Sequence, residues 1–285
     1  MNSTIKKNLR KDGIVLIPSV LDTQICHRAL NVIENILKTK DEDILLTEGN
    51  IERKICYAFE KDDIFLDILS SPAVITILQQ LYGDDISEIV PTWEDILIKK
   101  PLNGIPVEVH QDLGLSSLKS SDVFSLAFYF NDSICNPVNY LKGSQKLGPL
   151  DRNQIKEYSD PKLYTPYCAN MGDVTIHNVL TIHYSDPNTS SIPRYTWYLE
   201  FRTVSQIVND SPWDLEWAMK RQAIMAYAIE NRKSKGLDFI DIKFKNYLEL
   251  KKYIKNINLK VLHIGNGVEY TDNKYNHFEN HKTLF

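Results

Sequence analysis

The segment Val109-His110-Gln111-Asp112 (VHQD) places a histidine and an aspartate two residues apart. On an extended strand, side chains at positions i and i+2 point to the same face, so His110 and Asp112 can reach one ion. A second imidazole from a distant strand would complete three ligands on one side of a metal. Two histidines and one carboxylate with open positions opposite are the ligand set of non-haem Fe(II) oxygenases. Alone, the His-x-Asp pattern is weak, because such residues near strand ends are usually solvated.

A second segment strengthens this interpretation. It runs from Met171 to Arg202 and reads MGDVTIHNVLTIHYSDPNTSSIPRYTWYLEFR. Turn residues divide it into short β-rich runs, and the last of these, residues 195–201, is aromatic-rich and suits a buried strand. Arg194 opens that run, and a buried guanidinium needs an anion, for which a carboxylate is the natural bidentate partner. His177 and His183 both compete for the role of the third metal ligand.

With these motifs in this order, the chain resembles the phytanoyl-CoA dioxygenase family, a branch of the Fe(II)/2-oxoglutarate oxygenases. The matching pieces are Leu9 to Leu21 (LRKDGIVLIPSVL), Leu97-Ile98-Lys99-Lys100-Pro101, His110-Gln111-Asp112, and His183-x-Ser185-x-Pro187-Asn188 with Arg194 after it. The resemblance covers residues 8 to 203. One turn departs from the family pattern: where the family usually has Pro-Gly-Ser-His, this chain has Lys142-Gly143-Ser144-Gln145.

The resemblance implies that His110, Asp112 and His183 bind Fe(II) and form the catalytic centre. It favours His183 over His177, because the family's serine, proline, asparagine and arginine follow His183 in order. It also implies that Arg194 pairs with the distal carboxylate of 2-oxoglutarate.

Three further residues are expected to contact the co-substrate. By the resemblance, Ser185 donates a hydrogen bond to 2-oxoglutarate, and Lys100, the lysine before proline, also reaches it. Lys99 competes with Lys100, because neighbours on a strand face opposite ways. Phe128 or Tyr129 is expected to wall the co-substrate pocket, although aromatic residues in strands are commonly core residues.

The implied function is that of a 2-oxoglutarate-dependent dioxygenase using Fe(II) and O₂. Such an enzyme hydroxylates, or otherwise oxidises, an unactivated C–H bond. The carboxylate at Asp112 leaves no room for a halide on iron, which favours hydroxylation over halogenation. No basic cluster suited to coenzyme A phosphates is evident, so we expect a small metabolite, such as an amino acid or an intermediate of natural-product biosynthesis. Candidates for lining its pocket are Trp93, Asp95, Tyr140, Trp197 and Arg202.

Two other classes of protein remain open. A cupin-like metal enzyme with non-oxidative chemistry, such as an isomerase, would need the three ligands but has no use for Arg194 paired with Ser185. A non-catalytic relative that binds a metal or a ligand as a sensor would not require intact ligands.

The spacing of the strand-like segments predicts the fold. Between residues 91 and 203 such segments lie at 92–100, 106–111, 123–131, 138–141, 173–177, 180–185 and 194–203. Many short strands at this spacing predict a sandwich or barrel. With the resemblance, this becomes a mainly β fold with flanking helices, a double-stranded β-helix (jelly roll, cupin-like). We expect a single domain over residues 1–285, in which 1–90 form a strand and bracing helices, 91–203 the core with the metal site, and 204–285 a helical extension.

Capping residues predict where several helices begin. Asp22 and the pair Ser71-Pro72 are each expected to start one, and Pro212-Trp213-Asp214 another. Residues 238–256 are expected to form an exposed amphipathic helix. The polar residues 113–121, directly after the metal motif, are expected to be a mobile lip over the site.

Composition indicates a cytoplasmic enzyme. With 33 basic and 37 acidic residues the net charge is −4, which argues against a nucleic-acid partner. No apolar run approaches the ~18 residues of a membrane span, and no signal peptide follows the N-terminal lysines. The four cysteines show no paired spacing and are expected to be free thiols: Cys26, Cys56, Cys135 and Cys168. The expected partner is a small-molecule substrate, and the oligomeric state is left open.

Overall fold

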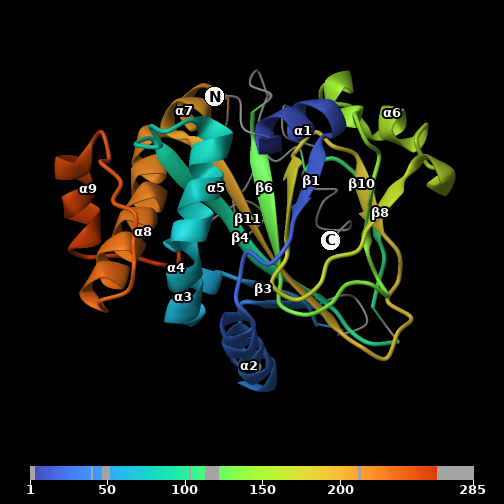
Figure 1. Ribbon diagram of the computed structural model, residues 1–285, viewed down its shortest axis with the longest axis horizontal. Helices are drawn as coiled ribbons and strands as arrows, with labels where there is room; N and C mark the ends of the chain where they lie inside the picture. The colour runs from blue at the N-terminus through green and yellow to red at the C-terminus, as the bar shows by residue number, and fades with distance from the viewer. Residues whose placement is uncertain are drawn as a thin grey trace.

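Two antiparallel sheets face each other in this computed structural model, which describes residues 4–39, 41–46, 52–102, 104–112, 122–210 and 213–261. Their strands are β1 (Ile14–Ile17), β2 (Ile44–Leu46), β3 (Glu52–Cys56), β4 (Ile89–Lys99), β5 (Val107–His110), β6 (Phe124–Tyr129), β7 (Val138–Tyr140), β8 (Thr165–Tyr167), β9 (Val174–Asn178), β10 (His183–Ser185) and β11 (Arg194–Thr203). Within these residues the larger sheet has the order β1-β9-β6-β11-β4-β3-β2 and the smaller β5-β10-β7-β8 (Figure 1). The expected jelly roll with flanking helices is confirmed.

Most helices cover the outer face and the ends of the larger sheet, whereas α6 (Arg152–Lys156) lies beside the smaller sheet (Figure 1). The helices are α1 (Thr4–Asp12), α2 (Thr23–Thr39), α3 (Ala58–Lys61), α4 (Asp63–Leu69), α5 (Pro72–Tyr82), α6 (Arg152–Lys156), α7 (Val204–Asp210), α8 (Leu215–Ser234) and α9 (Tyr247–Ile254), with 3₁₀ turns at Ser144–Leu147 and Pro161–Leu163. In the part of the chain that the structure describes, no single helix is long and apolar enough to cross a bilayer; α4 and α5, bent by 45°, meet that test only as a pair, by length and composition.

The predicted helix starts are confirmed by their caps. The Asp22 carboxylate accepts hydrogen bonds from the backbone N–H groups of Gln24 and Ile25 at the start of α2. The Ser71 hydroxyl accepts from the backbone N–H of Val74 in α5, and that helix begins with Pro72. Asp214 accepts from Trp217 in α8. Each cap satisfies a donor that the helix itself leaves unpaired.

Two predicted elements differ from the structure. Only Tyr247–Ile254 of the expected helix at 238–256 is helical. The residues before it alternate, with Ile240, Ile242 and Phe244 packed on the core, which suits extended chain. The expected strand at 180–185 begins only at His183, because Asn178 accepts from the backbone N–H groups of the next residues in a turn. The expected lip at 113–121 lies outside the described residues.

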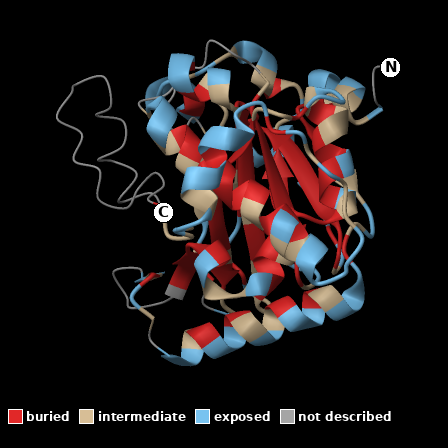
Figure 2. Cartoon of the chain, turned by 90° about the vertical axis from the view of Figure 1, so that its left-hand side faces the viewer, coloured by how far each residue is buried: buried red, intermediate tan, exposed pale blue. Residues whose placement is uncertain are grey.

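The alternation of β11 divides the interior into two parts. Trp197 and its i±2 neighbours point toward the helices, where the indole packs against Phe59, Phe65 and Phe128 with ring centroids 5.8, 5.2 and 5.2 Å away. Figure 2 shows this region buried, with the helices buried on their inner sides and exposed on their outer sides. The opposite face of β11 looks toward the smaller sheet and carries Arg194, Thr196, Tyr198, Glu200 and Arg202. The apolar core therefore lies under the helices, and polar side chains fill the space between the sheets.

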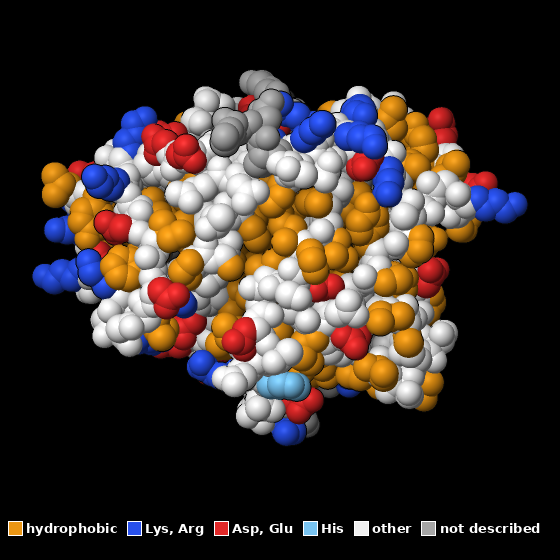
Figure 3. Space-filling model, in the orientation of Figure 1, with side chains coloured by type: hydrophobic (Ala, Val, Ile, Leu, Met, Phe, Trp, Pro, Cys, Tyr) orange, Lys and Arg blue, Asp and Glu red, His pale blue; other side chains and the backbone are white. Residues whose placement is uncertain are grey.

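The surface carries mixed charges, and the cysteines fit the sequence expectation. On the face seen in Figure 3, basic and acidic side chains are interspersed around a central area of apolar atoms. All four cysteines are free, as expected, and two of them, Cys26 and Cys56, are buried.

Replacing Phe128 with alanine should lower the free energy of unfolding by about 3–5 kcal/mol, because the ring is 0 % exposed and the cavity cannot refill. The matched control is Leu248→Ala in α9, where an 80 % exposed side chain should cost less than ~0.5 kcal/mol. Denaturant unfolding measures both. Equal losses for the two variants would contradict the packing described.

Candidate active site

Three predicted ligands converge between the sheets. His110, Asp112 and His183 each offer one ligand atom, and these atoms lie within 4.8 Å of one another. The backbone brings them together because β10 pairs with β5 in a register that sets His183 directly opposite His110. Nε2 of His183 lies 3.6 Å from Oδ1 of Asp112, and Nε2 of His110 lies 3.2 Å from the same oxygen. The geometry fits a single ion held from one side by two imidazoles and a carboxylate.

The residue between the two motif ligands holds the motif in place. Gln111 points away from the centre, and its amide donates to the backbone carbonyls of Leu180 and Gly148 at 2.7 and 3.0 Å. Its side-chain carbonyl accepts from the backbone N–H of Leu150 at 2.9 Å. A fully bonded, buried glutamine thus fixes the direction in which its two neighbours point.

The hydrogen bonds of His110 and His183 favour the tautomer that a metal would require. Nδ1 of His110 lies 2.7 Å from the carbonyl of Glu108, and Nδ1 of His183 lies 2.9 Å from the carbonyl of Thr181. A carbonyl only accepts, so each Nδ1 carries a proton, and Nε2 is the nitrogen that an ion could bind. The sequence supplies this arrangement locally, since each acceptor lies two residues before its histidine.

The charges of the centre favour cation binding. Burial and then neighbouring His110 lower the pKa of His183 to about 3, so this imidazole is neutral. Although burial alone would act in the opposite direction, the surrounding imidazoles hold the pKa of Asp112 well below its ordinary value. For His110 burial is likewise outweighed, and the hydrogen bond to Asp112 raises its pKa. A metal ion would replace the proton that His110 shares with the Asp112 carboxylate.

His177 supports the centre and is not one of the three converging ligands. Its Nε2–H donates to Oδ2 of Asp112 at 2.7 Å, and its ring is fully buried on β9. The hydroxyl of Tyr140 lies 3.5 Å from the other ring nitrogen, and the Tyr140 ring stacks on His183 at 5.2 Å. His177 therefore orients the carboxylate, a role that the sequence analysis did not assign to it.

Arg194 lies inside the barrel as predicted, with capacity for an anion. The side chain is 2 % exposed, and Nη1 donates to the carbonyl of Asn136 at 2.7 Å. Nε and Nη2 are buried without a hydrogen-bond partner among the described residues. A buried guanidinium with two unpaired donors is costly, and a carboxylate would satisfy it.

Ser185 and a lysine lie beside this arginine, but the lysine is Lys99. Ser185 follows His183 by two residues and shares its face of β10. Lys99 pairs across the ladder with Arg194, is 2 % exposed, and donates to the carbonyls of Ser185 and Asp186 at 3.2 and 2.5 Å. Burial and then the charge of Arg194 lower the pKa of Lys99 to about 6. Lys100, which the sequence analysis preferred, is half-buried past the strand end, so we transfer the expected role to Lys99.

The choice of Phe128 as a pocket wall is corrected in the same way. Phe128 points into the helical core against Trp197, on the far side of the sheet from the metal ligands. Its neighbour Tyr129 faces inward, and its hydroxyl lies 3.4 Å from Thr175. Strand alternation also removes Trp197 from the candidate substrate contacts, while Arg202 shares the inner face of β11 with Glu200.

The turn that departs from the family pattern has a structural role. Gln145 donates to the carbonyls of Leu9 and Arg10 at 3.1 Å each, which ties the turn to α1. Ser144 accepts the backbone N–H of Ile182 at 2.8 Å, one residue before the ligand His183. The turn thus positions the strand that carries the second histidine.

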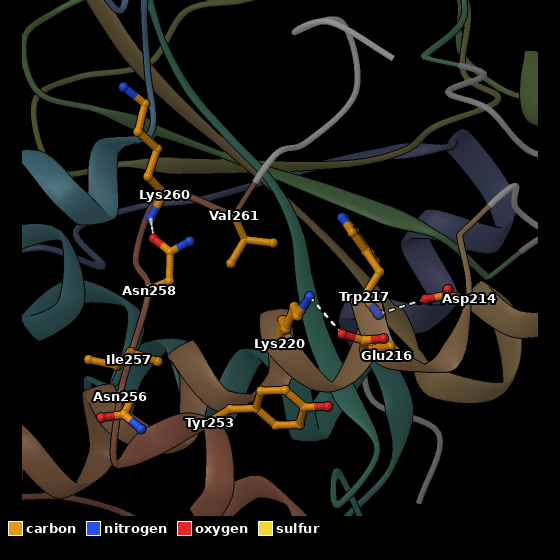
Figure 4. A pocket seen from close by; sticks show the side chains of 10 residues that line it. All are labelled: Asp214, Glu216, Trp217, Lys220, Tyr253, Asn256, Ile257, Asn258, Lys260 and Val261. Atoms are coloured by element: carbon orange, nitrogen blue, oxygen red, sulfur yellow. Dashed lines mark hydrogen bonds and ion pairs between the residues drawn. The ribbon is translucent and has the colours of Figure 1, made fainter. Parts of the chain in front are cut away.

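A separate cavity of about 500 Å³ lies between α8 and the chain around α9 (Figure 4). Its lining residues are Asp214, Glu216, Trp217, Lys220, Tyr253, Asn256, Ile257, Asn258, Lys260 and Val261. Lys220 and Glu216 pair with each other at 2.8 Å across one turn of α8. None of the converging metal ligands lines this cavity, so the candidate centre is the one between the sheets.

A jelly roll that encloses two histidines and an aspartate is the arrangement found in non-haem iron and 2-oxoglutarate oxygenases. The profile of the family described as phytanoyl-CoA dioxygenase (PhyH) matches residues 9–196. The chain belongs to this family, as the resemblance indicated. No curated protein matches the sequence.

Solved structures share this fold. The alpha ketoglutarate dependent epimerase SnoN from nogalamycin biosynthesis is 17% identical, with a TM-score of 0.58 over 70% of this chain and 81% of its own. The carbocyclase SnoK from the same biosynthesis is 19% identical, with a TM-score of 0.58 over 70% and 82%. EctD from S. alaskensis, with 2-oxoglutarate and 5-hydroxyectoine, is 16% identical, with a TM-score of 0.59 over 71% and 77%.

Removing any of the three converging ligands, as in His110→Ala, Asp112→Ala or His183→Ala, should abolish tight binding of Fe(II) or Mn(II). His177→Gln should weaken binding about 10- to 100-fold, because it removes an outer support and no ligand. Calorimetric titration of the metal-free chain measures both effects.

His27→Ala on the exposed side of α2 is the matched control and should leave metal affinity unchanged. Loss of binding in His177→Gln as complete as in His183→Ala would make His177 a ligand and contradict this assignment.

Proposed function

We propose that this chain is an Fe(II)- and 2-oxoglutarate-dependent oxygenase that hydroxylates a C–H bond of a small metabolite. The observation that carries the proposal is the pairing of two features inside one barrel. His110 and His183 lie on the smaller sheet, and Asp112 follows β5. Arg194 lies on the facing sheet, and within the described part of the chain its buried Nε and Nη2 have no hydrogen-bond partner.

The residues present fit both groups. His110, Asp112 and His183 would hold the iron through two Nε2 atoms and one carboxylate oxygen. Arg194 would bind the distal carboxylate of 2-oxoglutarate, with Lys99 and Ser185 beside it. With O₂, bound iron and 2-oxoglutarate supply the oxidant that attacks an unactivated C–H bond.

The protein's own contribution is placement and exclusion of water. Arg194 and Lys99 lie opposite each other on neighbouring strands, so they fix the co-substrate at one end of the barrel. The tyrosines Tyr129, Tyr140 and Tyr198 surround the centre, and burial raises the pKa of each above its ordinary value. They are therefore neutral at physiological pH and can donate hydrogen bonds without adding negative charge.

The non-oxidative alternative is less well supported, because an isomerase has no use for the two unpaired donors of Arg194. Among oxidative outcomes we propose hydroxylation. SnoN and SnoK, an epimerase and a carbocyclase, share the fold, so product analysis has to separate hydroxylation from these outcomes. An amino acid or a natural-product intermediate is the proposed class of substrate.

The function is tested first without a substrate. Anaerobic addition of Fe(II) and 2-oxoglutarate to the protein should give a weak charge-transfer band in visible light, and admission of O₂ should release succinate. Arg194→Gln should raise the dissociation constant of 2-oxoglutarate about 10- to 100-fold, since charged hydrogen bonds are lost. An absent band in the wild type, or unchanged affinity in Arg194→Gln, would overturn the proposal.

The two adjacent lysines provide a second test, based on protons. Lys99 has a pKa of about 6 and is mostly neutral at pH 7.5, and a bound dianion would raise that pKa. Binding of 2-oxoglutarate should therefore take up a proton, and affinity should fall as the pH rises above neutrality. Calorimetry in buffers of different ionisation enthalpy measures this uptake. Lys99→Met should abolish it, whereas Lys100→Met should preserve it; the reverse result would restore Lys100.

A further inference from the structure

A second guanidinium inside the barrel, that of Arg202, is a candidate to line the substrate pocket, but no ligand group has been assigned to it. Arg202 lies near the end of β11, is 0 % exposed, and donates from Nε to Oε1 of Glu200 at 2.7 Å. Nη1 and Nη2 are both buried without a hydrogen-bond partner among the described residues. The same Glu200 oxygen also accepts from the hydroxyl of Thr92 at 2.7 Å. The ion pair therefore leaves the forked end of the arginine unsatisfied.

Comparison with another buried arginine shows that this is not the usual state in the molecule. Arg221 in α8 is also 0 % exposed, but its Nη1 and Nη2 donate to the two oxygens of Glu94 and its Nε to the carbonyl of Pro91. Among the described residues, only Arg194 and Arg202 keep buried guanidinium nitrogens without partners. A structural arginine is saturated here, and an arginine expected to bind an anion is not.

Strand register places Arg202 on the same side of the sheet as the metal ligands. Glu200 lies opposite Ser125 on β6, and Ser125 lies opposite His177 on β9. Two strand spacings, roughly 10 Å, therefore separate the backbone of Glu200 from that of His177, whose ring contacts Asp112. Arg202 lies one step further along the inner face of β11, where the Trp213 ring is 6.0 Å from its guanidinium carbon.

The two arginines are too far apart to share one ligand. Eight residues of extended strand separate Arg194 from Arg202, roughly 26 Å of backbone, which no five-carbon diacid spans. With 2-oxoglutarate at Arg194, the donors of Arg202 remain available for a different anion.

We propose that Arg202 binds a carboxylate of the prime substrate and so selects acids over their neutral analogues. This inference rests on the proposed function, because only an enzyme has a prime substrate. The anion site itself does not depend on that function. The fork of Nη1 and Nη2 matches the two oxygens of a carboxylate, and Glu200 holds the guanidinium in place through Nε.

Fluorine NMR of trifluoroacetate, a carboxylate small enough for any such site, tests the proposal on the full-length metal-free chain. The background variant is Arg194→Gln, which removes the co-substrate site and leaves Arg202 as the expected site. This variant should bind trifluoroacetate and not the neutral trifluoroacetamide. Adding Arg202→Gln should weaken trifluoroacetate binding at least tenfold.

A thermal melt checks that each variant folds. If the glutamine variant does not fold, Arg202→Lys in the same background keeps the charge but loses the fork, and should still weaken binding severalfold. No binding in Arg194→Gln, or equal binding after either change at Arg202, would overturn the proposal.

The charge-transfer band with Fe(II) and 2-oxoglutarate separates this proposal from the proposed function. Arg202→Gln alone should keep the band, because Arg194 and the metal ligands are intact. A missing band in the wild type together with Arg202-dependent trifluoroacetate binding would overturn the oxygenase function and leave the anion site standing.

Discussion

The two-residue period of β11 is the constraint on which the rest of this structure depends. Each residue on one face packs under the helices, and each on the other face looks into the space between the sheets. Trp197 belongs to the first set and Arg194 to the second, although only two residues separate them along the chain. A shift of one position in the pairing would exchange the two faces, moving charged groups into the apolar core.

Buried charge inside the barrel follows from the same division. Lys54 and Asp95 pair at 2.5 Å on the inner face, and Lys99 donates to two backbone carbonyls. These groups are satisfied by each other or by the backbone, which limits the cost of their burial. In the part of the chain that the structure describes, buried guanidinium nitrogens without partners occur on Arg194 and Arg202, at opposite ends of β11.

The fold and the convergence of His110, Asp112 and His183 could be predicted from sequence because they are encoded as local patterns in a fixed order. The spacing of His110 and Asp112 brings them together, and the residues after His183 favoured it over His177. Which of two neighbouring strand residues faces inward could not be predicted where both are of a similar type. Residues 123–130 are all buried, so the choice between Phe128 and Tyr129 depended on cross-strand pairing. Lys99 and Lys100 are chemically identical, and only the ladder with β11 shows which one turns inward.

The hydrogen bond from His177 to Asp112 has a consequence for how many bonds the carboxylate can make to a metal. It occupies Oδ2, so only Oδ1 faces the two ligand imidazoles. An ion held by His110, Asp112 and His183 would therefore receive one oxygen from Asp112, so the protein would offer it three donors. An ion that prefers about six ligands would then keep room for a chelating keto acid and one further small molecule.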